Sequence, residues 1–399
     1  MAIQSAIRDR GREVIIVGAG PAGASLAIRL AAAGQAVTLV EKERFPREKL
    51  CGEFISPECF RHFGELGVLE VMLSLGGARL SETRFFDAAG RGVTVPTRWF
   101  GHGDFALSLS RARMDAILMD RAKAAGVTVL EGVRVTAADV DGGRIRGVTV
   151  RYDSGERAEF AADLFVDATG RAGTLTRLAE MAAHSPPKRP QLVAFKGHLR
   201  EVNIRPNACE IYVFPGGYGG LSPIEDGRAN LCFIVRAEAA KVFIGKTNKH
   251  LELIASRNRR AAETLSGAVD PGEWLAVPIG EFGRKTRPGP RNLIAIGDAA
   301  AFIDPFTGSG MLMAMETAEL FSKCVREAGP DAARLNERYA REHRGKFRNR
   351  LAASAVLRRA AFMPRLATAA ILAAGLSDGL RERLARATRS GSPAARKEG

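Results

Sequence analysis

Short apolar runs and helical stretches alternate at the start of the chain. Residues 14–17 and 37–40 are apolar runs, and the Ala/Leu-rich segment 22–33 between them ends at Gly34. Short apolar runs are typical of buried strands, and an Ala/Leu-rich segment closed by glycine is typical of a helix. The pattern predicts a strand–helix–strand unit with parallel strands, the building block of α/β folds.

The pattern farther along the chain predicts a second sheet that interrupts the first. Helical periodicity covers residues 57–75 and 114–125 and resumes from about Met311, and further buried-type strands are expected at 127–130, 144–152, 164–167 and 293–296. Alternating apolar and polar residues, typical of an antiparallel sheet, occur at 192–201, 209–214 and 230–235. We therefore expect a first, discontinuous domain of residues 12–80, 108–182 and 286–330, a second domain of residues 81–107 and 183–285, and a helical region of residues 331–399.

A glycine motif joins the first strand to the first helix. Gly18 allows the tight turn, Gly20 lets the backbone approach a pyrophosphate, and Gly23 lets helix and strand pack closely, while Ala22 lies in the first helical turn. The helix N-terminus then faces the phosphates. Glu41 ends the second strand, where a carboxylate accepts hydrogen bonds from an adenosine ribose. The motif predicts FAD or NAD and excludes NADP.

A second motif occupies residues 291–311, late in the chain. A predicted strand delivers Asp298 beside a turn, where its carboxylate can hold a polyol hydroxyl. Gly308, Gly310 and Met311 follow at a helix start, whose backbone N–H groups can approach an electron-rich oxygen. A positive helix end at this place would stabilise a reduced, anionic flavin. Together the two motifs favour FAD.

These motifs resemble those of the superfamily that contains geranylgeranyl reductases and flavoprotein monooxygenases. The resemblance implies an α/β fold with a Rossmann-type, glutathione-reductase-like FAD-binding domain, an antiparallel substrate domain and a helical C-terminal tail. Residues 163–171 resemble the central motif of that superfamily, although Ala168-Thr169-Gly170 departs from the aromatic hydroxylases. The resemblance also implies that Arg111 lies against the FAD and that the backbone at Val135 contacts the adenine.

Two further segments resemble the geranylgeranyl reductases in particular. Residues 49–54 resemble their Lys-x-Cys-Gly motif, which implies that Cys51, Gly52 and Phe54 lie along the flavin. Residues 210–215 resemble their Tyr-x-Trp-x-Phe-Pro motif, with Glu210 and Tyr212 in place of the first two aromatic residues. We expect Tyr212 to line an apolar pocket together with a glycine-rich turn at residues 216–220.

These observations favour an FAD-dependent oxidoreductase that reduces a carbon–carbon double bond in a hydrophobic small molecule. The alternatives are an FAD-dependent monooxygenase of an aromatic or polyketide-like substrate, a halogenase, and an FAD-binding module without catalysis. A halogenase is disfavoured because the chain lacks the tryptophan pair of the Trp-x-Trp-x-Ile-Pro motif. Electrons would come from NAD(P)H or from a separate reductase. Candidate proton donors are Cys51, Tyr212, His102 and Tyr218, of which none belongs to a convergent acid–base set.

The amino-acid composition limits the classes of protein to which the chain can belong. The chain has 399 residues of which 46% are hydrophobic, enough for a large core. Its five cysteines show no zinc-ligand spacing, so no metal site is expected. We find no secretion leader and no apolar run of the ~18 residues that a membrane-spanning helix needs. A cytoplasmic location follows as the expectation.

Positive charge is concentrated in the C-terminal region. Residues 331–399 hold 16 Lys/Arg and 6 Asp/Glu, which places +10 of the formal net charge of +15 there. Residues 366–376 within this region carry no charge and are mostly apolar. The pattern predicts helices with one basic face that either pack over the substrate domain or make a peripheral contact with an anionic membrane. Nucleic acid is not expected as a partner, because the tail is poor in aromatic residues and contains no binding module.

Overall fold

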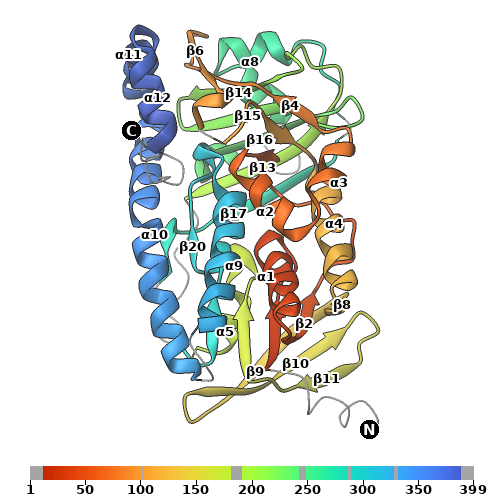
Figure 1. Ribbon diagram of the computed structural model, residues 1–399. Helices are drawn as coiled ribbons and strands as arrows, with labels where there is room; N and C mark the ends of the chain where they lie inside the picture. The colour runs from red at the N-terminus through yellow and green to blue at the C-terminus, as the bar shows by residue number, and fades with distance from the viewer. Residues whose placement is uncertain are drawn as a thin grey trace.

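The chain folds around two sheets, with long C-terminal helices along one side. The computed structural model describes residues 12–100, 102–180, 191–241, 249–270, 272–285, 289–327 and 331–387. Figure 1 shows a parallel sheet toward one end of the molecule, a larger twisted sheet at the other end, and the column of α10–α12 beside both. Of the predicted domain segments, residues 183–190, 286–288 and 388–399 lie outside the described residues.

The parallel sheet confirms the predicted strand–helix–strand unit. Helix α1, Pro21–Ala32, connects its first two strands. The strand order is β19 (Leu293–Ala295), β12 (Leu164–Asp167), β1 (Glu13–Val17), β2 (Ala36–Glu41) and β8 (Thr128–Glu131). Val14 and Ile16 of β1 pack toward the helices, whereas Ile15 and Val17 pack toward the opposite layer. Because both faces of this sheet are covered, its strands are apolar throughout.

Helices cover one face of the parallel sheet and a small antiparallel sheet covers the other. The helices that share this core with α1 are α2 (Glu58–Leu66), α3 (Leu69–Ser74), α4 (Arg111–Ala124) and α9 (Gly310–Glu327). The opposite layer contains β9 (Val133–Asp141), β10 (Arg144–Tyr152), β11 (Arg157–Phe160) and α5 (Thr174–Leu178). Two smaller sheets join the layers: β3 (Phe54–Ile55), β7 (Ala106–Ser108) and β4 (Ala78–Leu80); and β18 (Gly283–Arg284) with β20 (Ala301–Phe302).

The second large sheet has seven strands. In order, they are β17 (Trp274–Ile279), β13 (Leu192–Leu199), β16 (Ala229–Arg236), β15 (Gly217–Pro223), β14 (Ala208–Phe214), β5 (Glu82–Phe86) and β6 (Gly92–Pro96). All neighbours are antiparallel except β5 and β14, which run parallel. One face packs against α6 (Ala237–Ala240), α7 (Lys249–Ala255) and α8 (Arg259–Thr264). The other face points toward the parallel-sheet layer.

The glycine-rich stretch predicted as a turn is strand β15. The chain turns at Pro215 and Gly216 only, and Gly217 already pairs with Phe214 across the ladder. A Cβ on Gly217 would lie 2.3 Å from the Ile234 carbonyl oxygen, and one on Gly219 would lie 2.8 Å from Phe233 Cβ. The prediction was wrong because these glycines serve close strand packing rather than a turn.

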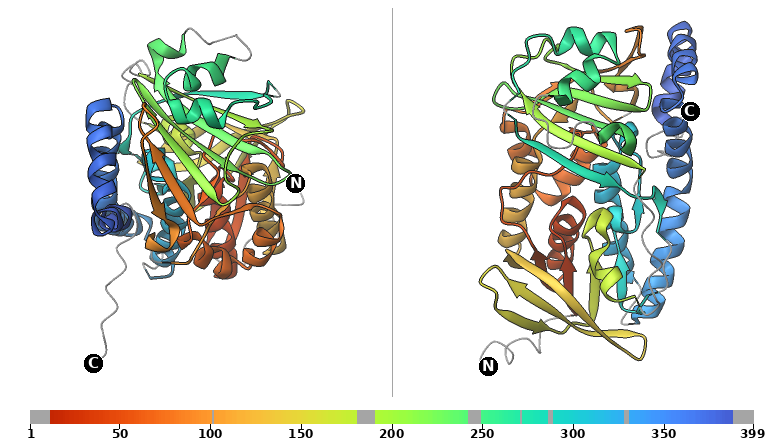
Figure 2. Two further views of the ribbon diagram at one scale, coloured as in Figure 1. Left: turned by 90° about the horizontal axis from the view of Figure 1, so that it is seen from above. Right: turned by 180° about the vertical axis from the view of Figure 1, so that it is seen from behind.

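The C-terminal region is helical, as predicted. It comprises α10 (Ala332–Ala361), α11 (Pro364–Leu376) and α12 (Asp378–Ala387). Asp331 caps α10 by accepting the N–H groups of Ala333 and Arg334, and Arg350 forms a buried ion pair with Glu316 of α9 at 2.5 Å. Figure 2 shows these helices standing beside both sheets in two further views. Among the described helices, none is long and apolar enough to cross a bilayer.

Two buried histidines make the stability of the fold depend on pH. Burial lowers the pKa of His62 on α2 and of His343 on α10 to about 4, whereas both titrate near 6.5 in an unfolded chain. Between these values the unfolded chain binds protons that the folded chain does not, so stability is lost as the pH falls. We expect the free energy of unfolding to decrease by about 3 kcal/mol per histidine between pH ~6.5 and ~4.

Urea unfolding across this pH range measures the effect. His62→Gln and His343→Gln should each flatten the pH dependence relative to wild type, because glutamine does not titrate. An unchanged slope in both variants would contradict the assignment of this proton uptake to the two histidines.

Candidate functional site

A large cleft separates the parallel-sheet layer from the seven-stranded sheet and is bordered by the C-terminal helices. Its volume is about 2010 Å³, whereas small-molecule pockets typically measure roughly 300–1,000 Å³. The lining extends from Glu41 and Val135 at one end to Ile371 and Ala374 of α11 at the other. The cleft therefore has room for a dinucleotide and for a second molecule beside it.

The turn from β1 to α1 leaves no space for side chains. Gly18 has a φ of +101°, and a Cβ there would lie 2.5 Å from the Ala168 carbonyl oxygen. A Cβ on Gly23 would lie 1.8 Å from the Gly18 carbonyl oxygen. Gly20 instead opens on the cleft, where the nearest neighbour of a Cβ would be Arg111 at 3.8 Å. The backbone at Gly20 can thus be approached closely by a ligand, as the motif predicts.

The first turn of α1 has the free N–H groups that an anion site requires. Its N-cap residue is Gly20, which provides no side-chain hydrogen bond to the exposed N–H groups, and Ala22 of the first turn borders the cleft. Free N–H groups at a helix N-terminus favour a phosphate. Lys49 and Arg171 also border the cleft, and burial lowers the pKa of each, for Lys49 with help from nearby Arg47 and Arg111. An anionic ligand would relieve this repulsion among buried cations.

Glu41 ends β2 at the same end of the cleft as Val135. Its two carboxylate oxygens accept the N–H groups of Ala19 at 2.8 Å and Glu43 at 3.1 Å. These bonds fix the carboxylate, and each oxygen keeps a lone pair for a further donor. The geometry suits a ribose diol and would repel a phosphate on that ribose.

Asp298 lies at the opposite side of the cleft, in the short helical turn Gly297–Ala299 that follows β19. Burial raises the pKa of its carboxyl group, although Arg171 and Lys285 oppose the shift. The carboxylate forms no hydrogen bond with another described residue. The side chain is half-buried and faces the cleft, so a ligand that covers it has to supply a donor, and a ligand hydroxyl fits the group. Gly310 and Met311, in the first turn of α9, border the cleft nearby.

The loop before β3 brings Cys51, Gly52 and Phe54 to the cleft. The Asn230 side chain donates to the Cys51 carbonyl oxygen at 3.1 Å, and the Glu53 N–H group donates to Cys51 Sγ at 3.3 Å. The Arg111 guanidinium also lies against this sulfur and makes a bidentate pair with Asp115 at 2.7 and 2.9 Å. The loop is therefore held from the seven-stranded sheet and from α4 at once.

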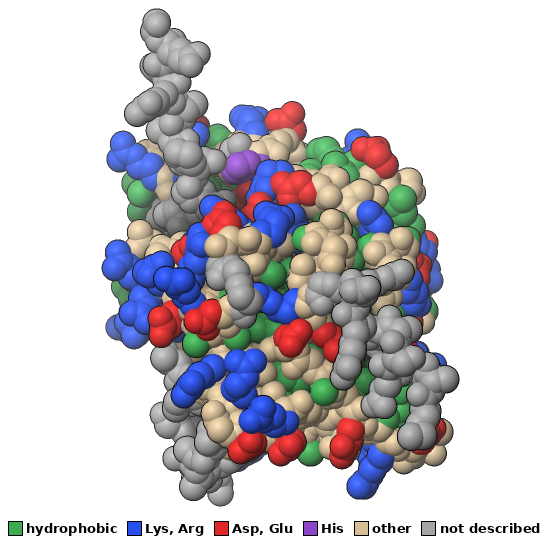
Figure 3. All heavy atoms as spheres, turned by 60° about the horizontal axis from the view of Figure 1, so that its bottom comes forward, with side chains coloured by type: hydrophobic (Ala, Val, Ile, Leu, Met, Phe, Trp, Pro, Cys, Tyr) green, Lys and Arg blue, Asp and Glu red, His purple; other side chains and the backbone are tan. Residues whose placement is uncertain are grey.

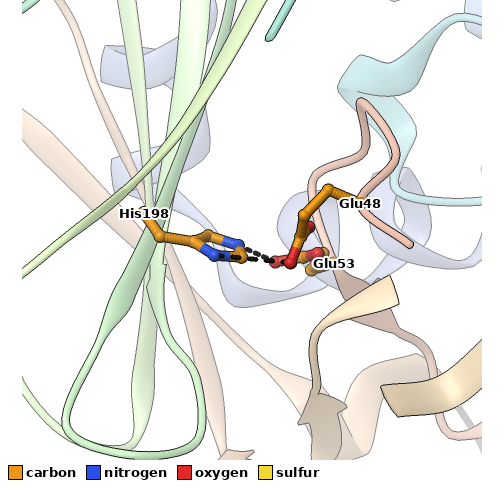
Figure 4. A group of neighbouring side chains, drawn as sticks. All are labelled: Glu48, Glu53 and His198. Atoms are coloured by element: carbon orange, nitrogen blue, oxygen red, sulfur yellow. Dashed lines mark hydrogen bonds and ion pairs between the residues drawn. The ribbon is translucent and has the colours of Figure 1, made fainter. Parts of the chain in front are cut away.

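A buried ionic cluster anchors this loop, and sequence reasoning missed it. Lys196 Nζ on β13 lies 2.6 Å from both Glu48 Oε2 and Glu53 Oε1, while His198 Nε2 lies 2.8 Å from Glu53 Oε2. Figure 4 shows Glu48, Glu53 and His198 pointing toward one another from the loop and from the sheet. Glu53 also accepts the N–H group of Arg111 at 2.8 Å. We call these four residues, Glu48, Glu53, Lys196 and His198, the Glu53 cluster.

The Glu53 cluster is an ion-pair network built around a lysine. Two carboxylates and one imidazole could ligate a metal ion, but the Lys196 ammonium already provides the positive charge between them. Burial lowers the pKa of Lys196, and the Glu53 and Glu48 carboxylates more than offset this, so the net shift is upward. The signal in the sequence was a lysine and a histidine two residues apart in an otherwise apolar strand.

Three of the candidate proton donors lie outside the cleft or donate their hydroxyl group to a neighbouring carboxylate. Tyr212 does not border the cleft: it is fully buried on the opposite face of the sheet, and its hydroxyl donates to Glu210 at 2.8 Å. His102 is exposed in a shallow depression beside α2, outside the cleft. Tyr218 borders the cleft, and its hydroxyl donates to Asp304 at 2.5 Å. The expectation that Tyr212 faces the substrate is therefore corrected.

The correction follows from strand geometry. Successive side chains of a strand point to opposite faces. On β14, Cys209, Ile211 and Val213 border the cleft, whereas Glu210 and Tyr212 point into the core beneath α8. The motif lies on a strand that borders the cleft, and its cleft-facing residues are the odd-numbered ones.

Comparison with known proteins identifies the group to which this site belongs. Residues 12–344 match the family described as FAD binding domain. The chain belongs to this family. It is an FAD-dependent oxidoreductase, as the two glycine motifs predicted, and the alternative of a module without catalysis is set aside. Gly18, Gly20, Glu41, Arg111, Asp298 and Gly310 surround the cleft in an arrangement that fits FAD.

Members with different reactions resemble the chain. A tryptophan 2-halogenase of Chondromyces crocatus is 28% identical over 361 residues, which cover 84% of this chain and 65%, less than two thirds, of that protein. A menaquinone reductase of Mycolicibacterium smegmatis is 27% identical over 336 residues, which cover 79% of this chain and 77% of that protein. The solved structure of a geranylgeranyl bacteriochlorophyll reductase-like protein of Thermoplasma acidophilum has a TM-score of 0.71 at 19% identity. The match covers 95% of this chain and 91% of that protein. The predicted superfamily and fold are confirmed, and the relatives span more than one reaction.

Proposed function

We propose that the chain is a flavin-dependent reductase of carbon–carbon double bonds in an apolar, chain-like substrate. The observation that carries the proposal is the lining of the cleft beyond Cys51. Side chains from the seven-stranded sheet, the turn Thr97–Phe100 and α11 border this part, and they are mostly apolar: Phe85, Val93, Val95, Phe100, Ile211, Val213, Ile371 and Ala374. Thr83 of β5 and Arg381 of α12 are polar side chains that also border the cleft. Such a lining favours a ligand that is apolar along its length.

The Cys51 thiol would supply the proton that alkene reduction requires, and the residues around it would stabilise the thiolate. Reduced FAD, when bound, supplies the hydride for one alkene carbon. The Cys51 thiol borders the cleft and can hold the proton for the other carbon. The Glu53 N–H group and the Arg111 guanidinium point at Cys51 Sγ, so both would stabilise the thiolate that remains. Solvent restores the proton afterwards.

Halogenation is the second candidate because a halogenase is among the relatives. The positions of the two tryptophans argue against halogenation. Trp274 on β17 donates to Asp270 and stacks on His250, and Trp99 lies beneath Arg381. Neither tryptophan borders the cleft.

Anaerobic turnover with a chain-like alkene tests the proposal. We expect the reduced, FAD-loaded protein to be reoxidised by geranylgeraniol under argon, with a product heavier by one H₂ per reduced double bond. Cys51→Ala should slow this reoxidation about 100-fold, the size of a lost general acid, without changing the flavin spectrum. Cys232→Ala is the matched control, because Cys232 borders the same cleft from β16.

The two candidate reactions give different products. A halogenated product in air with chloride or bromide, together with no anaerobic reduction of any alkene tested, would contradict the reductase. Equal rates of flavin reoxidation in Cys51→Ala and Cys232→Ala would show that Cys51 is not the proton donor. Alkene reduction would still be the reaction.

A further inference from the structure

The C-terminal helices expose an unusual number of large apolar side chains. The described residues include eight large hydrophobic side chains that are exposed, and six of them lie on α10–α12 or at the junction of α10 and α11. Leu376 is 89% exposed. We call these six the α11 patch: Val356, Met363, Leu366, Leu372, Leu376 and Leu380. They lie beyond residue 344, where the match to the family ends.

Helix α11 carries apolar side chains on both its inner and its outer face. Its inner face, with Ala367, Ile371 and Ala374, packs on Val93 of β6 and borders the cleft. Its outer face carries Leu366, Leu372 and Leu376, and Arg365 is the one charged residue between Pro364 and Leu376. A helix on the surface of a water-soluble domain has a polar outer face. The outer face of α11 therefore requires an apolar environment that the chain itself does not provide within the described residues.

The unpaired charges beside the α11 patch are positive. Arg359, Arg365 and Arg383 are exposed and form no ion pair with another described residue. The acidic residues nearby, Asp378 and Glu382, pair with Arg381 and Arg386 on the same helix. In contrast, basic and acidic side chains are interspersed on the end of the molecule seen in Figure 3. An apolar face flanked by unpaired arginines complements the surface of an anionic membrane.

We propose that the α11 patch docks on the surface of an anionic lipid bilayer. The 13 residues of α11 span about 20 Å, less than the hydrocarbon core of about 30 Å, so the helix would lie in the plane of the membrane. Its leucines would enter the acyl boundary while the arginines contact lipid phosphates. A second copy of the chain is a poorer occupant, because symmetric pairing of the patch would bring its arginines together.

Docking would place the cleft next to the bilayer, because α11 borders both. An apolar substrate dissolved in the membrane could then reach the cleft alongside α11 without crossing water. This route rests on the proposed function, whereas the docking surface does not.

Vesicle flotation of the full-length, FAD-loaded protein tests the docking surface. Vesicles of phosphatidylcholine alone are compared with vesicles of phosphatidylcholine and phosphatidylglycerol in equal amounts. We expect wild type to float with the anionic vesicles and to be released by high salt. Leu366→Glu combined with Leu372→Glu should reduce the bound fraction about tenfold or more, because two side chains that enter the acyl region become charged. Val71→Glu, at an exposed valine of α3, is the matched control and should bind as wild type does.

Three outcomes would overturn the proposal. These are failure of wild type to float with anionic vesicles, equal flotation of the double variant, and a wild-type dimer in light scattering that the same double variant abolishes. The anaerobic assay with detergent-solubilised geranylgeraniol is independent of docking. Flotation without alkene reduction therefore supports the docking surface and rejects the proposed function. Alkene reduction without flotation supports the proposed function and rejects the docking surface.

Discussion

The Gly23→Ala variant is expected to purify without flavin. A methyl group at this position would lie 1.8 Å from the Gly18 carbonyl oxygen and 3.1 Å from Ala168 Cβ, so α1 has to move away from β1. The atoms displaced are backbone atoms of the turn that is predicted to bind the pyrophosphate, and they cannot yield as a flexible side chain would. We expect the flavin absorbance per protein to fall at least about tenfold and the free energy of unfolding to fall by about 1–3 kcal/mol.

Gly64→Ala is the matched control. Gly64 also lies within a helix, α2, and a Cβ there has no neighbour within 4 Å. Alanine in place of a helical glycine stabilises by about 0.5–1 kcal/mol, so this variant should keep its flavin and become slightly more stable. Full flavin occupancy in Gly23→Ala would show that the turn relaxes without cost and would count against the assigned role of Gly23.

The second large effect is expected for Lys196→Met. This substitution removes the ammonium that lies 2.6 Å from Glu48 and Glu53 and leaves Glu53, which is fully buried, facing an apolar side chain. Removing one partner of a buried ion pair costs about 3–5 kcal/mol, because the remaining charge stays desolvated. Urea unfolding should show this loss, and the flavin should bind more weakly because Glu53 anchors the loop of Cys51.

A double-mutant cycle separates the ion pair from the packing of the lysine chain. Glu53→Gln in the Lys196→Met background removes the stranded charge, so the double variant should be less destabilised than the sum of the two single variants. Additive effects of the two substitutions would mean that the Lys196 stem, rather than its charge, stabilises the sheet.

The sequence alone was sufficient where local geometry dictates the residue. Gly18 and Gly23 are required by one turn, because a Cβ on either would overlap backbone atoms. Gly20, Glu41, Asp298 and Gly310 border the cleft, and their contacts with the cofactor stay predictions. Each of these motifs is a short stretch whose backbone conformation determines which residue fits. That is why the cofactor, the parallel sheet and the helical C-terminal region could be predicted without a structure.

Only the tertiary structure decided which groups meet across the cleft. Lys196 and Glu53 are more than 140 residues apart, and no local pattern indicates that they pair. Tyr212 was assigned to the cleft because a motif marks a strand but not the face that each residue presents, and one step along β14 reverses that face. The outer face of α11 is apolar in sequence like its inner face, and packing of Ile371 against β6 determines which face is exposed. Long-range pairing and the choice of face depend on how elements pack, and the amino-acid pattern of a single element does not contain that information.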